Sequence, residues 1–267
     1  MSNYLYAITA AKNPPRLGDL QGVSPMPGKG GRVELLTAGS VAAVVSDVAG
    51  SRIRPERRNL AAHQKVLDAI KAGGQPFLPS AFGIMAPSQK SLVAMLEANA
   101  DTLMGDLNRL ADKVEMTLRL KWNVPNIFDY FVGRTPDLAE LRDRYFGQPG
   151  GPSREDKIEL GSQFDQLLNQ ARERHVATLR RALGGVVEEF AEKPVADETM
   201  VCHLVCLITR DAEGAFEDKL VEAARLFDDH FAFDYNGPAA PHHFVQARLE
   251  MPGLEEDEPA GTALVEA

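Results

Sequence analysis

Residues 114–122, VEMTLRLKW, alternate apolar and polar side chains without interruption. The apolar positions are Val114, Met116, Leu118, Leu120 and Trp122. A period of two residues predicts a β-strand that buries one face and exposes the other. Such a strand needs partner strands and a covering layer, so this segment indicates a protein in which helices pack against a sheet.

Further elements are expected on the N-terminal side of this strand. Strands are predicted at residues 4–9, 33–37 and 41–48, the last apolar on both faces, and a short one at 76–85. Helices are predicted from Pro55 to Gly73 and from a cap at Ser88 to Leu110. Strands interleaved with two helices place the first 133 residues in the α+β class, near a ferredoxin-like sheet.

The C-terminal half gives a second α+β pattern. Ser153 to Asp156 resembles a capping box, and an apolar stripe then continues for almost forty residues. We expect this long helix to kink or split at Gly184-Gly185. Beyond it, strands are predicted at residues 199–209, 231–235 and 243–251, with a helix at 211–227.

Charge and loop signals suggest how the chain is divided. Residues 1–133 carry a net charge of +4 and residues 134–251 one of −8, and the GQPGGP stretch at 147–152 has the strongest loop signal. We therefore expect an N-terminal domain at 1–133, a C-terminal domain at 134–251 and an acidic, disordered tail at 252–267.

Composition excludes several classes of protein. The 267 residues are 44% hydrophobic and 25% charged, with a net charge of −9, which suits a folded soluble protein. The absence of a concentrated basic stripe argues against nucleic acid as the partner. Without a signal peptide or a membrane-length apolar run, a cytoplasmic protein is expected.

Possible metal and nucleophile residues do not form a recognisable motif. His63 and His175 lie on apolar helical stripes and are read as packed core residues. Cys202 and Cys206 would lie roughly 13 Å apart in one strand, too far for a disulfide. His203 would face away from Cys202, and the adjacent His242 and His243 would likewise face opposite sides.

Two other segments have a functional and a structural reading. The loop from Gly22 to Gly31 superficially resembles a phosphate cradle, but its spacing and its prolines fit a connecting loop better. The basic run from Arg52 to Arg58 suits either an acidic partner or, more simply, a solvated helix start. The residues thus predict no catalytic, cofactor-binding or metal-binding site, and no enzyme.

Several of these segments together resemble the gas vesicle protein F/L family (GvpF/GvpL). Six segments carry the similarity. In chain order they are YLY from Tyr4, AVVSDV from Ala43, LAAHQKVL from Leu60, FLPSAFG from Phe77, FDYNGP from Phe233 and PHHFV from Pro241. It spans residues 3–251. The chain departs from the family pattern at Ser80-Ala81-Phe82-Gly83, which lacks the usual arginine, and in the turn after Gly237, which lacks aromatic residues.

The resemblance implies a two-domain α+β fold with a modified ferredoxin-like first domain. It also implies a minor gas vesicle component within the cytoplasm that binds the major hydrophobic shell protein, supports shell nucleation or formation, and thereby contributes to buoyancy. Other minor vesicle proteins are further possible partners. Apolar strands and sheet edges of such a protein would cover the exposed apolar surface of unassembled shell subunits.

The sequence leaves two alternative functions open. A small-molecule enzyme or ligand-binding protein on a ferredoxin-like sheet would show a deep pocket that gathers His63 or His203 with carboxylates. A regulatory adaptor would work through the acidic tail at residues 252–267. An assembly protein would instead show an exposed apolar surface.

Overall fold

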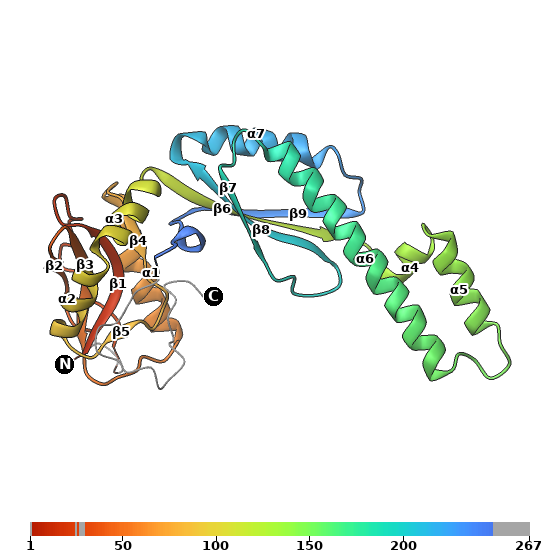
Figure 1. The fold of residues 1–267 in the computed structure, drawn as a ribbon, viewed down its shortest axis with the longest axis horizontal. Helices are drawn as coiled ribbons and strands as arrows, with labels where there is room; N and C mark the ends of the chain where they lie inside the picture. Colours follow the sequence, from red (N-terminus) through yellow and green to blue (C-terminus); the bar gives the residue numbers. More distant parts are fainter. Residues whose placement is uncertain (1, 25, 27–29, 248–267) are drawn as a thin grey trace. The chain divides into compact units, whose positions relative to one another are not determined.

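The computed structural model describes residues 2–24, 26 and 30–247. Helices and antiparallel sheets are mixed along the chain, which confirms the α+β class. The fold separates into two compact units (Figure 1). The first contains the chain up to Glu115 together with the segment that begins at Ala239, and the second contains Met116–Pro238.

The first unit is built on a sheet with the strand order β2-β3-β1-β4, and β5 also pairs with β1. Its strands are β1 (Ser2–Ala10), β2 (Val33–Ala38), β3 (Val41–Val48), β4 (Phe77–Pro79) and β5 (Met85–Ala86). The predicted hairpin of β2 and β3 is present, with Ala38 opposite Val41 and Gly39 at φ +58° in the turn. A left-handed residue in a tight hairpin turn favours glycine.

Helices cover this sheet on both faces. They are α1 (Arg57–Ala72), α2 (Gln89–Ala98) and α3 (Ala100–Arg109). Val44 and Val48 of β3 share an apolar core with Val66 and Ile70 of α1. On the opposite side of β3, Ala43 and Val45 are also buried, and α2 and α3 both contact this strand. Burial on two faces explains why the first five residues of β3, 41–45, are all apolar.

The predicted helix after Ser88 is correct in its start but not in its length. Ser88 is the N-cap of α2 and forms a capping box with Ser91. Two helices replace the one expected, because α2 ends at Asn99, whose side-chain amide donates to the carbonyl of Met95 over 2.7 Å. A side chain that bonds to the backbone in this way competes with continued helix.

The second unit holds a sheet with the strand order β7-β8-β6-β9. Its strands are β6 (Lys113–Trp122), β7 (Glu189–Lys193), β8 (Met200–Thr209) and β9 (Phe231–Ala239). β8 lies between β6 and β7, and β6 lies between β8 and β9, so both strand–helix–strand connections are split by a strand. This is the ferredoxin-like arrangement. The sheet of the first unit has the same order when its strands are counted along the chain: second, third, first, fourth. It is the modified ferredoxin-like sheet predicted for the N-terminal half, because the residues described between β1 and β2 form a loop in place of the first helix.

Four helices belong to the second unit: α4 (Ile127–Val132), α5 (Pro136–Phe146), α6 (Arg154–Leu183) and α7 (Glu213–Ala224). The C-terminal half of α6 and helix α7 pack against β8 (Figure 1). The N-terminal half of α6 packs instead with α4 and α5, where Phe164 contacts the rings of Phe128 and Phe131. The connection from β6 to β7 thus carries a three-helix extension, formed by α4, α5 and the first half of α6.

Several expected boundaries differ from the structure. The chain divides after Glu115 and again before Ala239, not after residue 133. The GQPGGP stretch joins α5 to α6 as a turn, with Gly150 and Gly151 at positive φ. Glycine and proline give the same loop signal in a helical hairpin as in a domain linker.

Two further differences lie near the ends of elements. The long helix ends at Leu183, so Phe190 belongs to strand β7 and not to a continued helix. The strand predicted at 243–251 is wrong at its start, because His242–Phe244 forms a 3-10 turn. Its residues from 248 onward, and the predicted tail at 252–267, lie outside the described residues.

Candidate functional sites

Three of the segments that carry the family resemblance, YLY, LAAHQKVL and FLPSAFG, meet in one aromatic cluster of the first unit. Tyr4 and Tyr6 of β1 lie against the ring of His63 from α1, with ring centroids 5.7 and 5.6 Å away. Phe82 lies at 5.7 Å from the same imidazole. His63 is therefore the packed core histidine that its apolar helical stripe predicted.

Hydrogen bonds complete this cluster. The amide of Gly83 donates to the Tyr4 hydroxyl over 2.9 Å, and that hydroxyl lies 3.0 Å from Nδ1 of His63. The imidazole also forms a hydrogen bond with the backbone of Ser80. Burial, together with the nearby His242, lowers the pKa of His63 to about 4. A neutral, fully bonded imidazole stabilises the fold and leaves no open position for a ligand.

The Gly-rich loop closes over the same cluster. The Tyr6 hydroxyl lies 2.8 Å from Ser46 Oγ and accepts a hydrogen bond from the Val23 amide. A Cβ at Gly22 would lie 2.2 Å from the Tyr6 hydroxyl oxygen. Glycine is needed here for close approach of the backbone, which supports the connecting-loop reading over a phosphate cradle.

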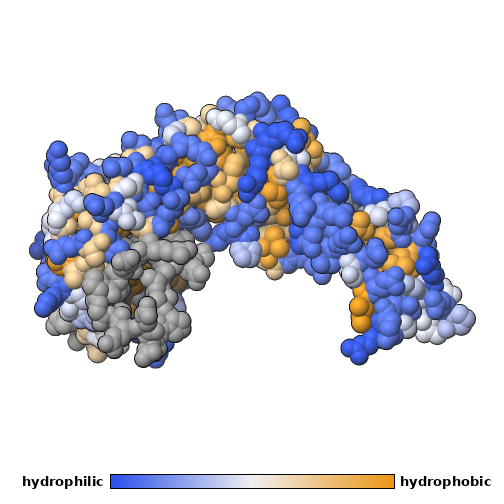
Figure 2. Space-filling view, viewed as in Figure 1, coloured by the Kyte–Doolittle hydropathy of each residue, from blue (hydrophilic) through white to orange (hydrophobic). Residues whose placement is uncertain are grey.

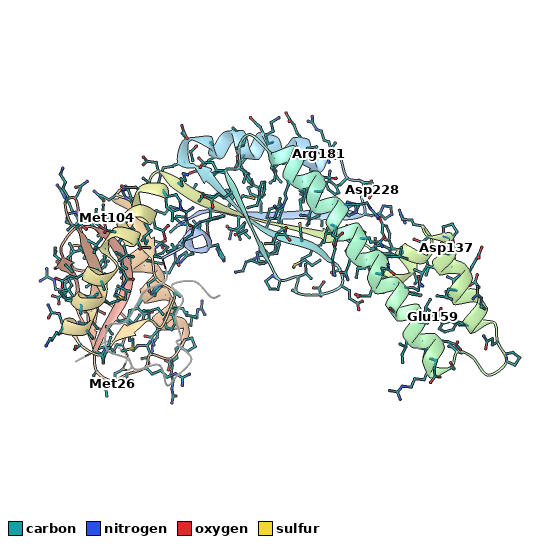
Figure 3. The ribbon with its side chains drawn as sticks, in the orientation of Figure 1. Met26, Met104, Asp137, Glu159, Arg181 and Asp228 are labelled. Carbon is teal, nitrogen blue, oxygen red and sulfur yellow. The ribbon has the colours of Figure 1, made fainter. Side chains whose placement is uncertain are left out.

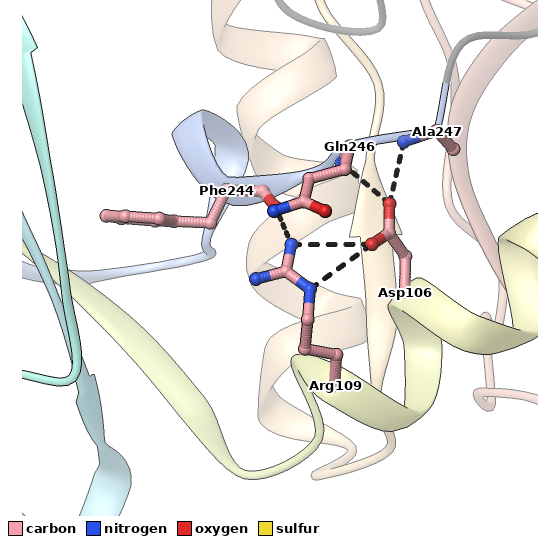
Figure 4. Close-up of polar contacts among 5 residues, drawn as sticks. All are labelled: Asp106, Arg109, Phe244, Gln246 and Ala247. Carbon is pink, nitrogen blue, oxygen red and sulfur yellow. Dashed lines mark hydrogen bonds and ion pairs between the residues drawn. The ribbon is translucent and has the colours of Figure 1, made fainter.

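A second cluster, which we call the C-terminal clasp, holds the end of the described chain against the first unit (Figure 4). The Asp106 carboxylate on α3 accepts hydrogen bonds of 2.7 Å from the amides of Gln246 and Ala247. Arg109, one turn later, pairs with the other oxygen of Asp106 and donates to the Phe244 carbonyl. The two side chains thus fix three backbone groups without any regular strand pairing.

Glu115 of β6 adds a third side chain to the clasp. Its carboxylate accepts from the His243 amide over 3.1 Å and lies 3.0 Å from His243 Nδ1. Burial lowers the pKa of the neighbouring His242, against the opposing effect of Glu115. The prediction that His242 and His243 face opposite sides of a strand does not apply, because both lie in a 3-10 turn. His243 helps to anchor the chain end through Glu115.

The sequence did not identify the clasp. Glu115 falls on the polar side of the 114–122 alternation, which predicts exposure, yet it is buried. Asp106 lies beside the buried Leu107, and both occupy the core side of α3. A carboxylate on an apolar helical stripe is the signal that points to such a buried contact.

His175 and the two cysteines are packed in the second unit. His175 of α6 lies among the rings of Trp122, Phe227 and Phe231, and burial lowers its pKa. Burial also raises the pKa of both Cys202 and Cys206 to about 12, so both are protonated thiols at neutral pH. These residues contribute to packing rather than to nucleophilic chemistry.

His203 does not join the cysteines. In β8 it lies opposite Lys193 of β7, and Cys206 lies opposite Phe190. His203 and Cys206 are three positions apart in one strand, so their side chains face opposite sides of the sheet. Within the described parts of the chain, no group of three His, Cys, Asp or Glu side chains is placed to hold a metal ion.

The basic run leads into a groove on α1. The groove has a volume of about 390 Å³ and is lined by Arg58, Ala61, Ala62 and Lys65 of α1 with Ser24 and Met26 of the preceding loop. Figure 3 shows Met26 at the rim of the first unit. The groove contains neither His63 nor His203 and gathers no carboxylate, so it lacks the features expected of the enzyme alternative.

Exposed apolar residues mark the far end of the three-helix extension. Phe146 at the end of α5 is 59% exposed, and Ile158 in the first turns of α6 is 61% exposed. Next to them in sequence, the Tyr145 hydroxyl donates to Glu159 over 2.6 Å and ties the two helices together. We call Phe146 and Ile158 the hairpin tip. Figure 3 labels Glu159 on α6, and Figure 2 shows hydrophobic surface on this hairpin.

Among the residues that the structure describes, no helix is both long and apolar enough to cross a membrane. The features above define a two-unit α+β protein with an anchored chain end, a basic groove and an exposed apolar helical tip.

Comparison with known proteins identifies its family. Residues 2–246 match the family described as gas vesicle synthesis protein GvpL/GvpF, and the chain belongs to this family. Gas vesicle protein F of Streptomyces sp. (strain CB03234) is 28% identical over 249 residues, which cover 92% of this chain and 100% of that protein. Gas vesicle protein F of Dolichospermum flosaquae is 24% identical over 91% of this chain and 97% of its own length.

Two crystal structures show the same fold. Gas vesicle protein GvpF from Anabaena sp. PCC7120 superposes with a TM-score of 0.76 at 24% identity, over 92% of this chain and 98% of that one. GvpF from Microcystis aeruginosa gives a TM-score of 0.74 at 20% identity, over 92% and 99%. Family membership associates this chain with gas vesicles and buoyancy.

Proposed function

We propose that this chain is a minor, non-enzymatic structural or assembly component of the gas vesicle. In this role it binds the major hydrophobic shell protein and supports nucleation or formation of the shell inside the cytoplasm. The family match over residues 2–246 is the observation that carries the proposal. Other minor vesicle proteins are further proposed partners.

The hairpin tip is the surface we propose for the shell protein. A shell subunit that encloses gas exposes apolar surface before assembly, and such surface aggregates unless another protein covers it. Phe146 and Ile158 offer large apolar side chains at the end of an extension whose two helices are tied together by Tyr145 and Glu159. An exposed aromatic residue on a rigid support is typical of a contact that dominates binding.

The second unit is suited to present this tip. The first half of α6 continues directly into the half that packs on the sheet, where the Arg172 guanidinium donates to the Met200 carbonyl over 3.0 Å. A continuous helix of 30 residues therefore connects the tip to the sheet. Because the support is a single helix, no flexible linker lies between the tip and the sheet, and the tip is held in a fixed position on the second unit.

Gene removal in the host tests the cellular role. The coding sequence is deleted from a strain that forms vesicles, and vesicles are counted by electron microscopy before and after wild-type complementation. We expect few or no vesicles without the chain and recovery with it. Normal vesicle numbers and shapes in the deletion strain would contradict an assembly role.

A further inference from the structure

The α1 groove has the chemistry of a site for an acidic, partly apolar peptide. Arg58 and Lys65 line it seven residues apart, which places them about 10 Å from each other along the helix. Ala61 and Ala62 lie between them and leave room for a ligand, and Met26 provides an apolar wall that is 57% exposed. Arg58 also pairs with Glu56 at the groove's edge.

More positive charge surrounds this groove. Arg54 and Arg57, on the N-terminal side of Arg58, are both exposed. Arg54 is held in place because its carbonyl accepts a hydrogen bond from the Asn59 side chain, which also accepts from the Ser24 amide. The basic residues and the groove therefore form one connected surface of the first unit.

The chain itself returns to α1 before it leaves the described structure. Ala240 packs against the core that contains Val66, Leu67 and Ile70 of α1. His242 is close enough to His63 of α1 to affect its pKa, and Asp106 then fixes Ala247. The 20 residues from 248 to 267 thus begin on the same unit as the groove.

The sequence that follows matches the groove in charge and character. Leu254 is followed by four consecutive acids, Glu255, Glu256, Asp257 and Glu258, and residues 252–267 contain no lysine or arginine. Glu255 lies eight positions after Ala247, which allows a reach of up to about 26–29 Å. Because the tail is tethered to its target, even weak ion pairs would be populated.

We propose that the acidic segment 254–258 of this chain docks into the α1 groove, with its carboxylates on Arg58, Lys65 and the adjoining arginines. The tail then covers the basic surface of its own first unit until an acidic competitor displaces it. This contact is independent of shell-protein binding at the hairpin tip.

Zero-length carbodiimide cross-linking of the full chain tests this contact, because it joins a carboxylate to a lysine only when they touch. We expect peptides that join Lys65 to residues 255–258 within the monomer, several-fold more abundant than those joining Lys12 or Lys90, two exposed lysines of the same unit. The excess should fall at high salt, since exposed ion pairs are screened.

The variant E255Q/E256Q/D257N/E258Q lacks the carboxylates that react in the cross-linking, so it is compared with the wild type by hydrogen exchange instead. Hydrogen exchange should be faster at residues 54–65 in this variant than in the wild type, and unchanged in α6. Equal cross-linking of all three lysines, cross-links found only in covalent dimers, or identical exchange in both proteins would overturn the proposal.

Discussion

Asp106 and Ala247 are joined by a hydrogen bond of 2.7 Å across 141 positions of sequence. The same carboxylate oxygen accepts from Gln246, and Arg109 neutralises the other oxygen. The Asp106 carboxylate on α3 thereby accepts hydrogen bonds from two backbone amides that lie outside any strand. The second unit is inserted in sequence between the two parts of the first unit, and the clasp holds these two parts together.

Substitution of Asp106 should release this chain end. Asp106→Asn keeps the size of the side chain but weakens its bonds to two backbone amides and to Arg109. We expect a loss of about 2–3 kcal/mol in the free energy of unfolding, measured in urea, because bonds to charged groups are worth about 1.5–3 kcal/mol. Amide exchange at residues 244–247 should also accelerate.

Glu97→Gln on the exposed face of α2 is the matched control, and it should change stability by less than about 0.5 kcal/mol. Equal stability of the Asp106 variant and the wild type would show that the clasp does not hold the chain end.

Acidification should destabilise the protein through His63. Its pKa is about 4 in the folded protein against an ordinary value of 6.5. Between these two pH values, His63 is protonated in the unfolded chain but neutral in the folded one. The stabilisation is complete above about pH 6.5 and is lost as the pH falls towards 4, with a slope of up to about 1.4 kcal/mol per pH unit. Burial also lowers the pKa of His175 and His242, which act in the same direction.

Urea unfolding at a series of pH values measures this slope. His63→Gln removes the titrating group, so its slope between pH 6.5 and 4 should be smaller than that of the wild type, whatever its absolute stability. A His63 variant with the wild-type slope would show that this residue is not a buried neutral imidazole.

The Gly-rich loop should tolerate no side chain at Gly22. Gly22→Ala forces a methyl group into the Tyr6 hydroxyl and into Ser46, whose Oγ would lie 2.4 Å away. We expect destabilisation of about 1–3 kcal/mol by overpacking, measured by thermal or urea unfolding. Gly161→Ala on α6 meets nothing within 4 Å and should be neutral or slightly stabilising. Similar values for the two variants would rule out the close approach.

Local patterns in the sequence predicted most individual elements. The alternation at 114–122 is strand β6, the doubly apolar segment at 41–48 is β3, and both serine caps lie where their spacing placed them. These features depend on residues near one another in the chain. The order of strands does not, because β6 pairs with β8 and β9 from more distant sequence.

The candidate sites show the same limit. The packed role of His63 follows from its apolar stripe, but its bond to Tyr4 joins residues 59 positions apart. The clasp was missed because Asp106 and Glu115 gain their partners from residues 243–247, across at least 128 positions. The family resemblance captured part of this information indirectly, since three of its segments, which are distant in sequence, meet in the aromatic cluster.

Co-purification measures whether this chain binds the major shell protein through the hairpin tip. The tagged chain is co-expressed with the major shell protein, and soluble shell protein that elutes with the tag is quantified. We compare the wild type with F146S/I158S at the hairpin tip and with V221S/L226S on and just beyond α7, where the two side chains are 56% and 62% exposed. The control pair therefore matches the tip in number and exposure.

We expect the wild type and V221S/L226S to retain soluble shell protein, whereas F146S/I158S should lose most of it. Loss of two exposed apolar anchors should weaken binding at least about tenfold, since residues of this kind contribute about 1–2 kcal/mol or more each. Retention by all three proteins would place the contact elsewhere. Shell protein that aggregates equally with and without the wild-type chain would contradict the proposed function itself.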